Sequence, residues 1–130
     1  EGLDGPVRII SLVLHYCQSE VQDHKVFTFY CLMALQKCLD HSLALREFME
    51  MNNLIQSFLF VYHKSEKVET QAQALRLIAT LCSNDNRAMQ NLFNQLGGIS
   101  DLVSLLANYV RNRPPLVGTK AGVKLSIKST

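Results

Sequence analysis

The sequence predicts an all-α fold made of stacked helical repeats, and three observations support this prediction. Apolar residues recur at positions i, i+3, i+4 and i+7 along most of the chain, which places an apolar stripe on each of several helices. Before residue 115, no segment shows the strict apolar–polar alternation that is typical of a strand. The helical pattern also repeats after 40 to 45 residues, a period that is typical of stacked solenoids.

The apolar stripes predict where most of the helices lie. Each stripe is a set of four residues with helical spacing, and an amphipathic helix buries such a stripe against a neighbour. In chain order, the sets are Ile10, Val13, Leu14 and Cys17; Ile55, Phe58, Leu59 and Tyr62; Leu75, Ile78, Ala79 and Cys82; Met89, Leu92, Phe93 and Leu96; and Ile99, Leu102, Val103 and Leu106.

Short polar or glycine-containing breaks predict the ends of these helices. Asp4 and Pro6 are expected to open the first helix, because aspartate caps free amides and proline is tolerated in the first turn. Ser42 is expected to cap the third helix, residues 83–85 form a polar break, and the Gly97-Gly98 pair ends the sixth helix. Seven helices are therefore expected, over residues 7–17, 21–40, 43–51, 54–64, 67–83, 86–96 and 99–112.

Two parts of the chain can be aligned with each other. Residues 34–62 match residues 74–109, with an offset of 40 at the Ala34-Leu35 and Ala74-Leu75 pairs. The offset grows to 45 where Asn52-Asn53-Leu54 is aligned with Gly97-Gly98-Ile99. A single unit of this kind cannot bury its apolar stripes alone, so neighbouring units are expected to stack and share one continuous core.

The stretch 74–106, which reads ALRLIA…N…LGGISDLVSLL, resembles the armadillo repeat, and HEAT-type helical repeats are a close alternative. The resemblance implies a right-handed superhelix in which residues 43–83 form one full repeat. Residues 7–40 would then be a second and third helix, and residues 86–112 a first and second helix. Neither end shows the polar cap of a terminal repeat, so we expect a helical-repeat domain over residues 1–112 that is truncated at both ends.

Composition and charge argue against several functional classes. Hydrophobic residues make up 48% of the chain and charged residues only 18%, below the roughly 25% that is usual in globular domains. Residues 1–110 carry eight basic and eleven acidic side chains, a formal charge of −3, whereas the last twenty residues carry five basic side chains and no acidic one. A body of this charge is not built to bind nucleic acid. No apolar stretch reaches the roughly 18 residues needed to span a membrane, so no membrane association is expected.

The four cysteines, Cys17, Cys31, Cys38 and Cys82, lie in apolar helical patterns and form no CxxC pair. We expect free, buried thiols, which fits an intracellular protein, either cytoplasmic or nuclear. Cys38 and His41 are three residues apart, but a structural zinc site needs four ligands and no second pair is spaced to match. No catalytic nucleophile motif or phosphate-binding loop is present, so we expect a non-catalytic chain without a cofactor.

The third helices of armadillo repeats line a concave face, and the resemblance implies where such a face would lie. Peptide-binding members of the family carry a Trp-x-x-x-Asn pattern there, and the matching positions are Met33 and Lys37, then Gln73 and Leu77. Because the chain has no tryptophan, capture of basic import signals is not expected. The face would instead bind a partner helix or extended peptide, with packing between repeats as the alternative role for Phe29 and Met33. The expected contact residues are Phe29, Met33, Lys37, Thr70, Gln73 and Leu77.

Residues 113–130 form a basic tail or linker, in which Pro114 and Pro115 end the preceding helix. Three interpretations stay open for this tail. It is a connector or an insertion between repeats, an extended segment that docks on the acidic body or on a neighbour, or a basic segment attracted to nucleic acid or an anionic surface. The contacts of the tail would come from Lys120, Lys124 and Lys128.

The function expected from these observations is that of a protein–protein interaction scaffold, as a fragment of a larger helical-repeat protein. It would bind a peptide or a helix of a partner on the concave face of its third helices. The alternatives are a structural spacer in a large assembly, and a nucleic-acid-associated module that acts through the basic tail. The sequence leaves the oligomeric state open.

Overall fold

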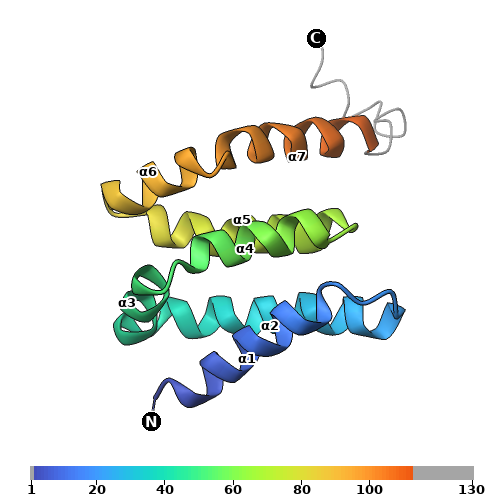
Figure 1. Ribbon diagram of the computed structural model, residues 1–130. Helices are drawn as coiled ribbons and strands as arrows, with labels where there is room; N and C mark the ends of the chain where they lie inside the picture. Colours follow the sequence, from blue (N-terminus) through green and yellow to red (C-terminus); the bar gives the residue numbers. More distant parts are fainter. Residues whose placement is uncertain (1, 113–130) are drawn as a thin grey trace, which may run out of the picture.

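The structure is a computed structural model, and it describes residues 2–112 of the chain. All regular structure in that range is α-helical (Figure 1), which confirms the expected all-α class. The expected tail contacts Lys120, Lys124 and Lys128 lie outside the described residues. The helices are α1 (Asp4–Tyr16), α2 (Gln22–Asp40), α3 (Leu43–Met51), α4 (Leu54–Lys64), α5 (Val68–Cys82), α6 (Arg87–Gln95) and α7 (Gly98–Asn112).

The helix bounds agree with the sequence prediction to within three residues, and the largest difference is at the first helix. α1 begins at Asp4 and not at residue 7, so Asp4 and Pro6 lie inside its first turn and Leu3 precedes it. An acidic side chain in the first turn interacts favourably with the positive end of the helix dipole. Ser42 caps α3 as predicted, because its hydroxyl accepts a hydrogen bond from the Leu45 amide at 3.0 Å.

The helices are arranged in three layers along the molecule (Figure 1). α1 packs against α2 in the first layer, α4 packs against α5 in the second, and α6 continues into α7 in the third. α5 is the central helix, since it contacts α2 on one side and both α6 and α7 on the other. The short helix α3 contacts α2 and α4 and so connects the first layer to the second.

The core runs through the first two layers and thins towards the third. Leu32 and Leu35 of α2, Phe58 of α4 and Leu77 of α5 are almost completely buried. Burying a large apolar side chain of this kind contributes about 1.5–3 kcal/mol. By contrast, α6 has no buried residue, and Leu105 is the one buried apolar side chain among those described on α7. The third layer therefore leaves much of its apolar surface uncovered.

A helix pair recurs with a spacing of 44 residues. α3 and α6 each have nine residues, and their caps Ser42 and Asn86 each accept a hydrogen bond from the amide three residues further on. Asn53 and Gly97, also 44 residues apart, have left-handed backbones with φ of 56° and 84° and stand directly before α4 and α7. The polar break expected at residues 83–85 thus supplies the turn before α6, whereas Asn86 supplies its cap.

α2 and α5 share a burial pattern with a spacing of 42 residues. The offset of 40 that was taken from Ala34 and Ala74 is wrong by two residues, because Ala34 is half-buried whereas Ala74 has no exposed surface. A dipeptide can recur out of register by chance, whereas burial reports which side of each helix faces the core. The matched buried positions are Thr28 and Thr70, Cys31 and Gln73, Leu32 and Ala74, Leu35 and Leu77, Gln36 and Ile78, and Leu39 and Leu81.

Candidate interaction surface

The concave face was predicted on the third helix of each repeat, and these helices are α2 and α5. This face is only partly open, and its exposed residues are on α2. Met33 is 38% exposed, Lys37 is exposed and Phe29 is half-buried. Phe29 and Thr70 line one shallow pocket of about 250 Å³ together with Lys67, so the structure brings these two predicted residues together. Met33 and Lys37 do not line that pocket.

The three predicted contact residues on α5 are buried, which corrects their placement on an open face. Thr70, Gln73 and Leu77 are 5%, 9% and 0% exposed, respectively. The physical reason is the two-residue error in the alignment of α2 with α5. With the spacing of 42, the position of α5 that matches Lys37 is Ala79 and not Leu77, and Ala79 is exposed.

Gln73 contributes to a hydrogen-bonded contact between α2 and α5. Its side-chain amide donates to Oε1 of Gln36 at 3.5 Å. The Gln36 amide donates in turn to the hydroxyl of Thr80 at 2.9 Å and to the carboxylate of Asp40 at 3.0 Å. A buried polar group left without a partner costs about 1–3 kcal/mol, so these bonds fix the two helices in one register.

A continuous exposed apolar surface lies on α7. Ile99, Val103 and Leu106 are 51%, 60% and 56% exposed, although apolar side chains at helical spacing are normally covered by a neighbouring element. An uncovered apolar patch of this kind is typical of an interaction site. We call this surface the α7 stripe, and it consists of Ile99, Leu102, Val103, Leu106, Tyr109 and Val110.

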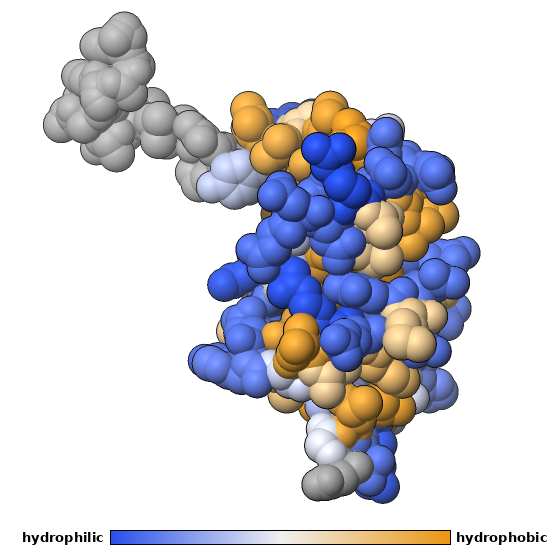
Figure 2. Space-filling view, turned by 90° about the vertical axis from the view of Figure 1, so that its left-hand side faces the viewer, coloured by the Kyte–Doolittle hydropathy of each residue, from blue (hydrophilic) through white to orange (hydrophobic). Residues whose placement is uncertain are grey.

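The α7 stripe leads into an apolar groove of about 330 Å³ between α5, α6 and α7. Ile99 and Leu102 belong to both the groove and the stripe, and Gln90 is the one hydrogen-bonding side chain of the lining besides a thiol. Figure 2 shows apolar atoms exposed at the end of the molecule that α6 and α7 form, at the top of the view. A concave, mostly apolar surface suits a helix or a peptide. The lining residues are Leu75, Ile78, Ala79, Cys82, Gln90, Phe93, Ile99 and Leu102.

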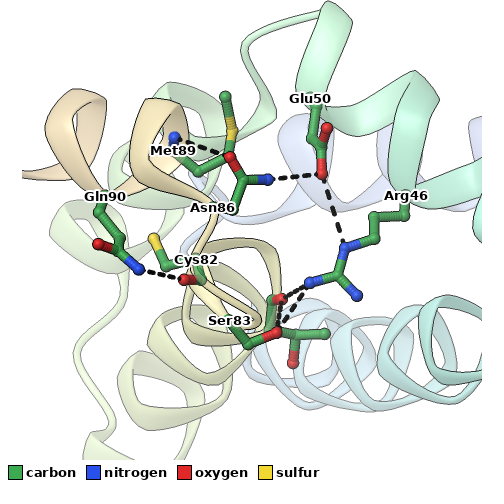
Figure 3. A network of polar contacts seen from close by, with 8 residues as sticks. Arg46, Glu50, Cys82, Ser83, Asn86, Met89 and Gln90 are labelled. Atoms are coloured by element: carbon green, nitrogen blue, oxygen red, sulfur yellow. Dashed lines mark hydrogen bonds and ion pairs between the residues drawn. The ribbon is translucent and has the colours of Figure 1, made fainter.

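One wall of the groove, α6, is attached to α3 and α5 through polar side chains (Figure 3). The side-chain oxygen of Asn86 accepts a hydrogen bond from the Met89 amide at 3.3 Å, and its side-chain amide donates to Glu50 at 2.9 Å. One turn further on, Gln90 donates to the backbone carbonyl of Cys82 at 2.8 Å. The bonds to the Met89 amide and to the Cys82 carbonyl satisfy backbone groups that helix ends leave without partners, and the bond to Glu50 connects the start of α6 to α3.

Arg46 of α3 reaches the same turn from the other side (Figure 3). Its guanidinium donates to the backbone carbonyl of Thr80, and to the hydroxyl of Ser83 at 2.8 Å. Its Nε lies 3.6 Å from a carboxylate oxygen of Glu50. A cation beside the last carbonyls of a helix interacts favourably with the negative end of the helix dipole. The turn between α5 and α6 is thus held by α3.

α7 is anchored at its first turns to α4 and α6. The Tyr62 hydroxyl donates to the backbone carbonyl of Asp101 at 2.9 Å, and Nε2 of His63 lies 3.1 Å from the Asp101 carboxylate. Gly98 lies so close to Phe93 that a Cβ at this position would overlap the Phe93 ring. The α7 stripe is therefore presented by a helix whose start is fixed by specific contacts.

The thiol in the groove does not have the properties of a nucleophile. Burial raises the pKa of Cys82, and it does the same for Cys17 and Cys31, so these thiols stay protonated at neutral pH. All four cysteines are free, as predicted, but only Cys17 and Cys31 are buried, whereas Cys38 and Cys82 are half-buried. Within residues 2–112, no three His, Cys, Asp and Glu side chains gather closely enough to hold a metal ion. No helix in this range has the length and apolar character needed to cross a membrane.

Sequence reasoning found the α7 stripe as a helical pattern but did not predict its exposure. Ile99, Leu102 and Val103 belong to a set that was expected to be buried between repeats. The signal that could have revealed the exposure lies further along the chain. α4 is followed within four residues by α5, which covers it, whereas α7 is followed by the Pro114-Pro115 pair.

Neither a protein-family model, nor a curated protein, nor a solved structure matches this chain.

Proposed function

We propose that this chain is a non-catalytic protein–protein interaction scaffold built from armadillo-like helical repeats. It binds a helix or a peptide of a partner protein through the groove and the α7 stripe, and it uses no cofactor. The observation that carries the proposal is the stripe itself. Its six large apolar side chains follow helical spacing, each is at least 38% exposed, and an apolar groove lies beside them.

The armadillo-like part of the proposal is supported by internal repetition. The pair α3–α4 recurs as α6–α7 after 44 residues, with equivalent caps and equivalent left-handed residues. The third helices α2 and α5 recur after 42 residues with the same buried positions. In a right-handed superhelix of such units, each unit leaves one apolar side for the next unit to cover, and exposed apolar surface at the third layer fits that arrangement.

The face formed by α2 and α5 is the second candidate for the binding surface. Tyr30 and Met33 on α2 are 60% and 38% exposed, and Lys37 follows them one turn later. The exposed positions of α5 include Ala72 and Arg76, which are small or charged. Binding energy comes mainly from large apolar and aromatic anchors that become buried, so the observations favour the α7 stripe.

The experiment that tests this function isolates the proteins and nucleic acids that bind the full chain in a cell lysate and compares three altered versions of the chain with it. The first carries Val103→Asp and Leu106→Asp, two changes at exposed positions of the α7 stripe. The second is the matched control, with Tyr30→Asp and Met33→Asp on the α2 face. The third lacks residues 113–130. Leu77 is left unchanged, because it is fully buried and a charge there would unfold the chain.

Each result points to one function. A protein that is lost with the changes in the α7 stripe, and kept with the control changes, supports the proposed scaffold. Loss with the α2 changes moves binding to the third helices. Loss of a nucleic acid on deletion of residues 113–130, with a steep dependence on salt, favours a nucleic-acid-associated module. Retention of every bound protein by all three versions favours a structural spacer with contacts spread over its surface.

A further inference from the structure

We infer that the groove and the α7 stripe are the seat of one amphipathic helix from a partner protein, which packs on α7 as α5 packs on α4. This inference rests on the proposed function and specifies the partner. It makes the partner a structural substitute for the third helix of the unit that contains α6 and α7. α4 and α7 are equivalent helices that begin 44 residues apart.

α4 carries an apolar stripe equivalent to the α7 stripe, but in α4 this stripe is covered by another helix. Its four residues are at most 6% exposed, and the helix that packs along α4 is α5. Counting 44 residues forward from each one leads to an apolar residue of the α7 stripe that is at least 38% exposed. The same apolar pattern is therefore buried in one unit and open in the next. The pairs are Ile55 and Ile99, Phe58 and Leu102, Leu59 and Val103, and Tyr62 and Leu106.

The other side of the groove continues an interface that already exists in the molecule. Gln36 of α2 bonds to Thr80 of α5, so this position of a third helix faces the next third helix. With the spacing of 42 residues, the equivalent of Gln36 is Ile78, which lines the groove. A helix in the groove would thus contact α5 as α5 contacts α2. Because Ile78 is apolar where Gln36 is polar, the contact surface of that helix is apolar here.

The chain's own sequence disfavours a helix at this place. The spacing of 44 matches residues 112–126, which begin at the last residue of α7, with residues 68–82 of α5 in the sequence. That segment contains Pro114, Pro115, Gly118 and Gly122. Gly118 and Gly122 match the interior positions Ala74 and Ile78 of α5, and glycine disfavours a helix interior, whereas Pro114 and Pro115 match the first turn, where proline is tolerated. Residues 112–126 are therefore disfavoured as this helix, and our assignment is to a helix of a partner protein. By analogy with α5 it has about four turns, roughly 22 Å, and an apolar stripe at i, i+3, i+4 and i+7.

The test uses a synthetic helix with the sequence of α5, because α5 covers the equivalent surface of α4. The peptide spans residues 68–82 with Cys82→Ser, carries a fluorophore, and has a covalent staple between positions 72 and 76. Both stapled positions are exposed in α5, so the staple holds the helix without changing its buried side. A stapled peptide of the same composition in scrambled order is the control. Fluorescence anisotropy measures binding of each peptide to the full chain.

We expect saturable binding of the α5 peptide and not of the scrambled peptide. Val103→Asp and Leu106→Asp should each weaken it at least about tenfold, since a charge would be buried against the apolar stripe. Met51→Asp is the matched control, because Met51 is 82% exposed on α3, and it should leave the affinity unchanged. Circular dichroism should show equal helix content in all variants, because the altered side chains are exposed.

Three results would overturn the inference. The first is absence of saturable binding, or binding that the two α7 changes leave unaltered. The second is a dimer in sedimentation equilibrium that Leu106→Asp dissociates, because a second copy would then cover the stripe. The third is a rise of more than about tenfold in peptide affinity on deletion of residues 113–130, because the tail would then occupy the groove. If a lysate protein is lost with the α7 changes while the peptide does not bind, the scaffold function stands and only the helical partner is wrong.

Discussion

The hydroxyl of Tyr62 on α4 donates a hydrogen bond to the backbone carbonyl of Asp101 on α7, across 2.9 Å. Tyr62 is 6% exposed, and its burial, together with the negative charge of Asp101, raises its pKa above the ordinary value. Both effects favour the neutral phenol, which is the form that donates this bond. The bond joins the second layer to the third and so positions the helix that carries the α7 stripe.

Tyr62→Phe should lower the free energy of unfolding by about 1 kcal/mol at neutral pH, because the hydrogen bond is lost while most of the ring stays buried. The pKa of Tyr62 is higher in the folded than in the unfolded chain, where it is about 10. The contribution of Tyr62 to the free energy of unfolding is therefore complete below about pH 10, the pKa in the unfolded chain. This contribution is lost as the pH rises through the pKa of Tyr62 in the folded chain. Urea unfolding of both proteins at neutral and alkaline pH measures this. A constant difference across the alkaline range would contradict the assignment.

Asn86→Ala should lower the free energy of unfolding by about 1–2 kcal/mol, because it removes the cap of α6 and the hydrogen bond to Glu50 together. Asn86→Ser is the informative comparison. Serine can cap the helix but cannot reach Glu50 in the same way, so this variant should recover about half of the loss. Urea unfolding of the three proteins gives the values. Equal stability of the Ala and Ser variants would show that capping contributes little at this position.

Gly97→Val should lower the free energy of unfolding by at least about 1–2 kcal/mol, because Gly97 has a φ of 84°, which a β-branched residue adopts only with strain. Gly97→Asn should cost much less. Asn53 stands at the equivalent position 44 residues earlier and has a φ of 56°. Thermal unfolding followed by circular dichroism compares the two variants with the wild type. An asparagine variant as unstable as the valine variant would mean that the two turns are not equivalent.

The helices and their bounds could be predicted because their signals are local. The cap at Ser42, the left-handed turn at Gly97 and the apolar spacing within each helix all depend on residues a few positions apart. The first helix was predicted three residues short because Asp4 and Pro6 were taken as its boundary, whereas both lie in its first turn. Local signals thus located the helices, but a polar side chain before a helix is compatible with more than one start.

The register between units could not be predicted in the same way. The Ala34-Leu35 and Ala74-Leu75 pairs suggested an offset of 40, and that offset placed Leu77 on an open face. Burial in the folded chain shows an offset of 42 and places Leu77 in the core. Exposure of the α7 stripe was missed for a related reason. Whether an apolar stripe is covered depends on another helix, and the pattern within the stripe carries no information about that helix.

Leu77→Ala and Leu106→Ala test this difference directly, because helical periodicity alone treats the two leucines alike. Leu77 has no exposed surface, so its truncation leaves a cavity and should lower the free energy of unfolding by about 2–5 kcal/mol. Leu106 is 56% exposed, so its truncation should change stability by less than about 0.5 kcal/mol. Urea unfolding at low protein concentration measures both. A similar loss for Leu106→Ala would mean that the stripe is already covered in the free protein, and it would then be unavailable to a partner.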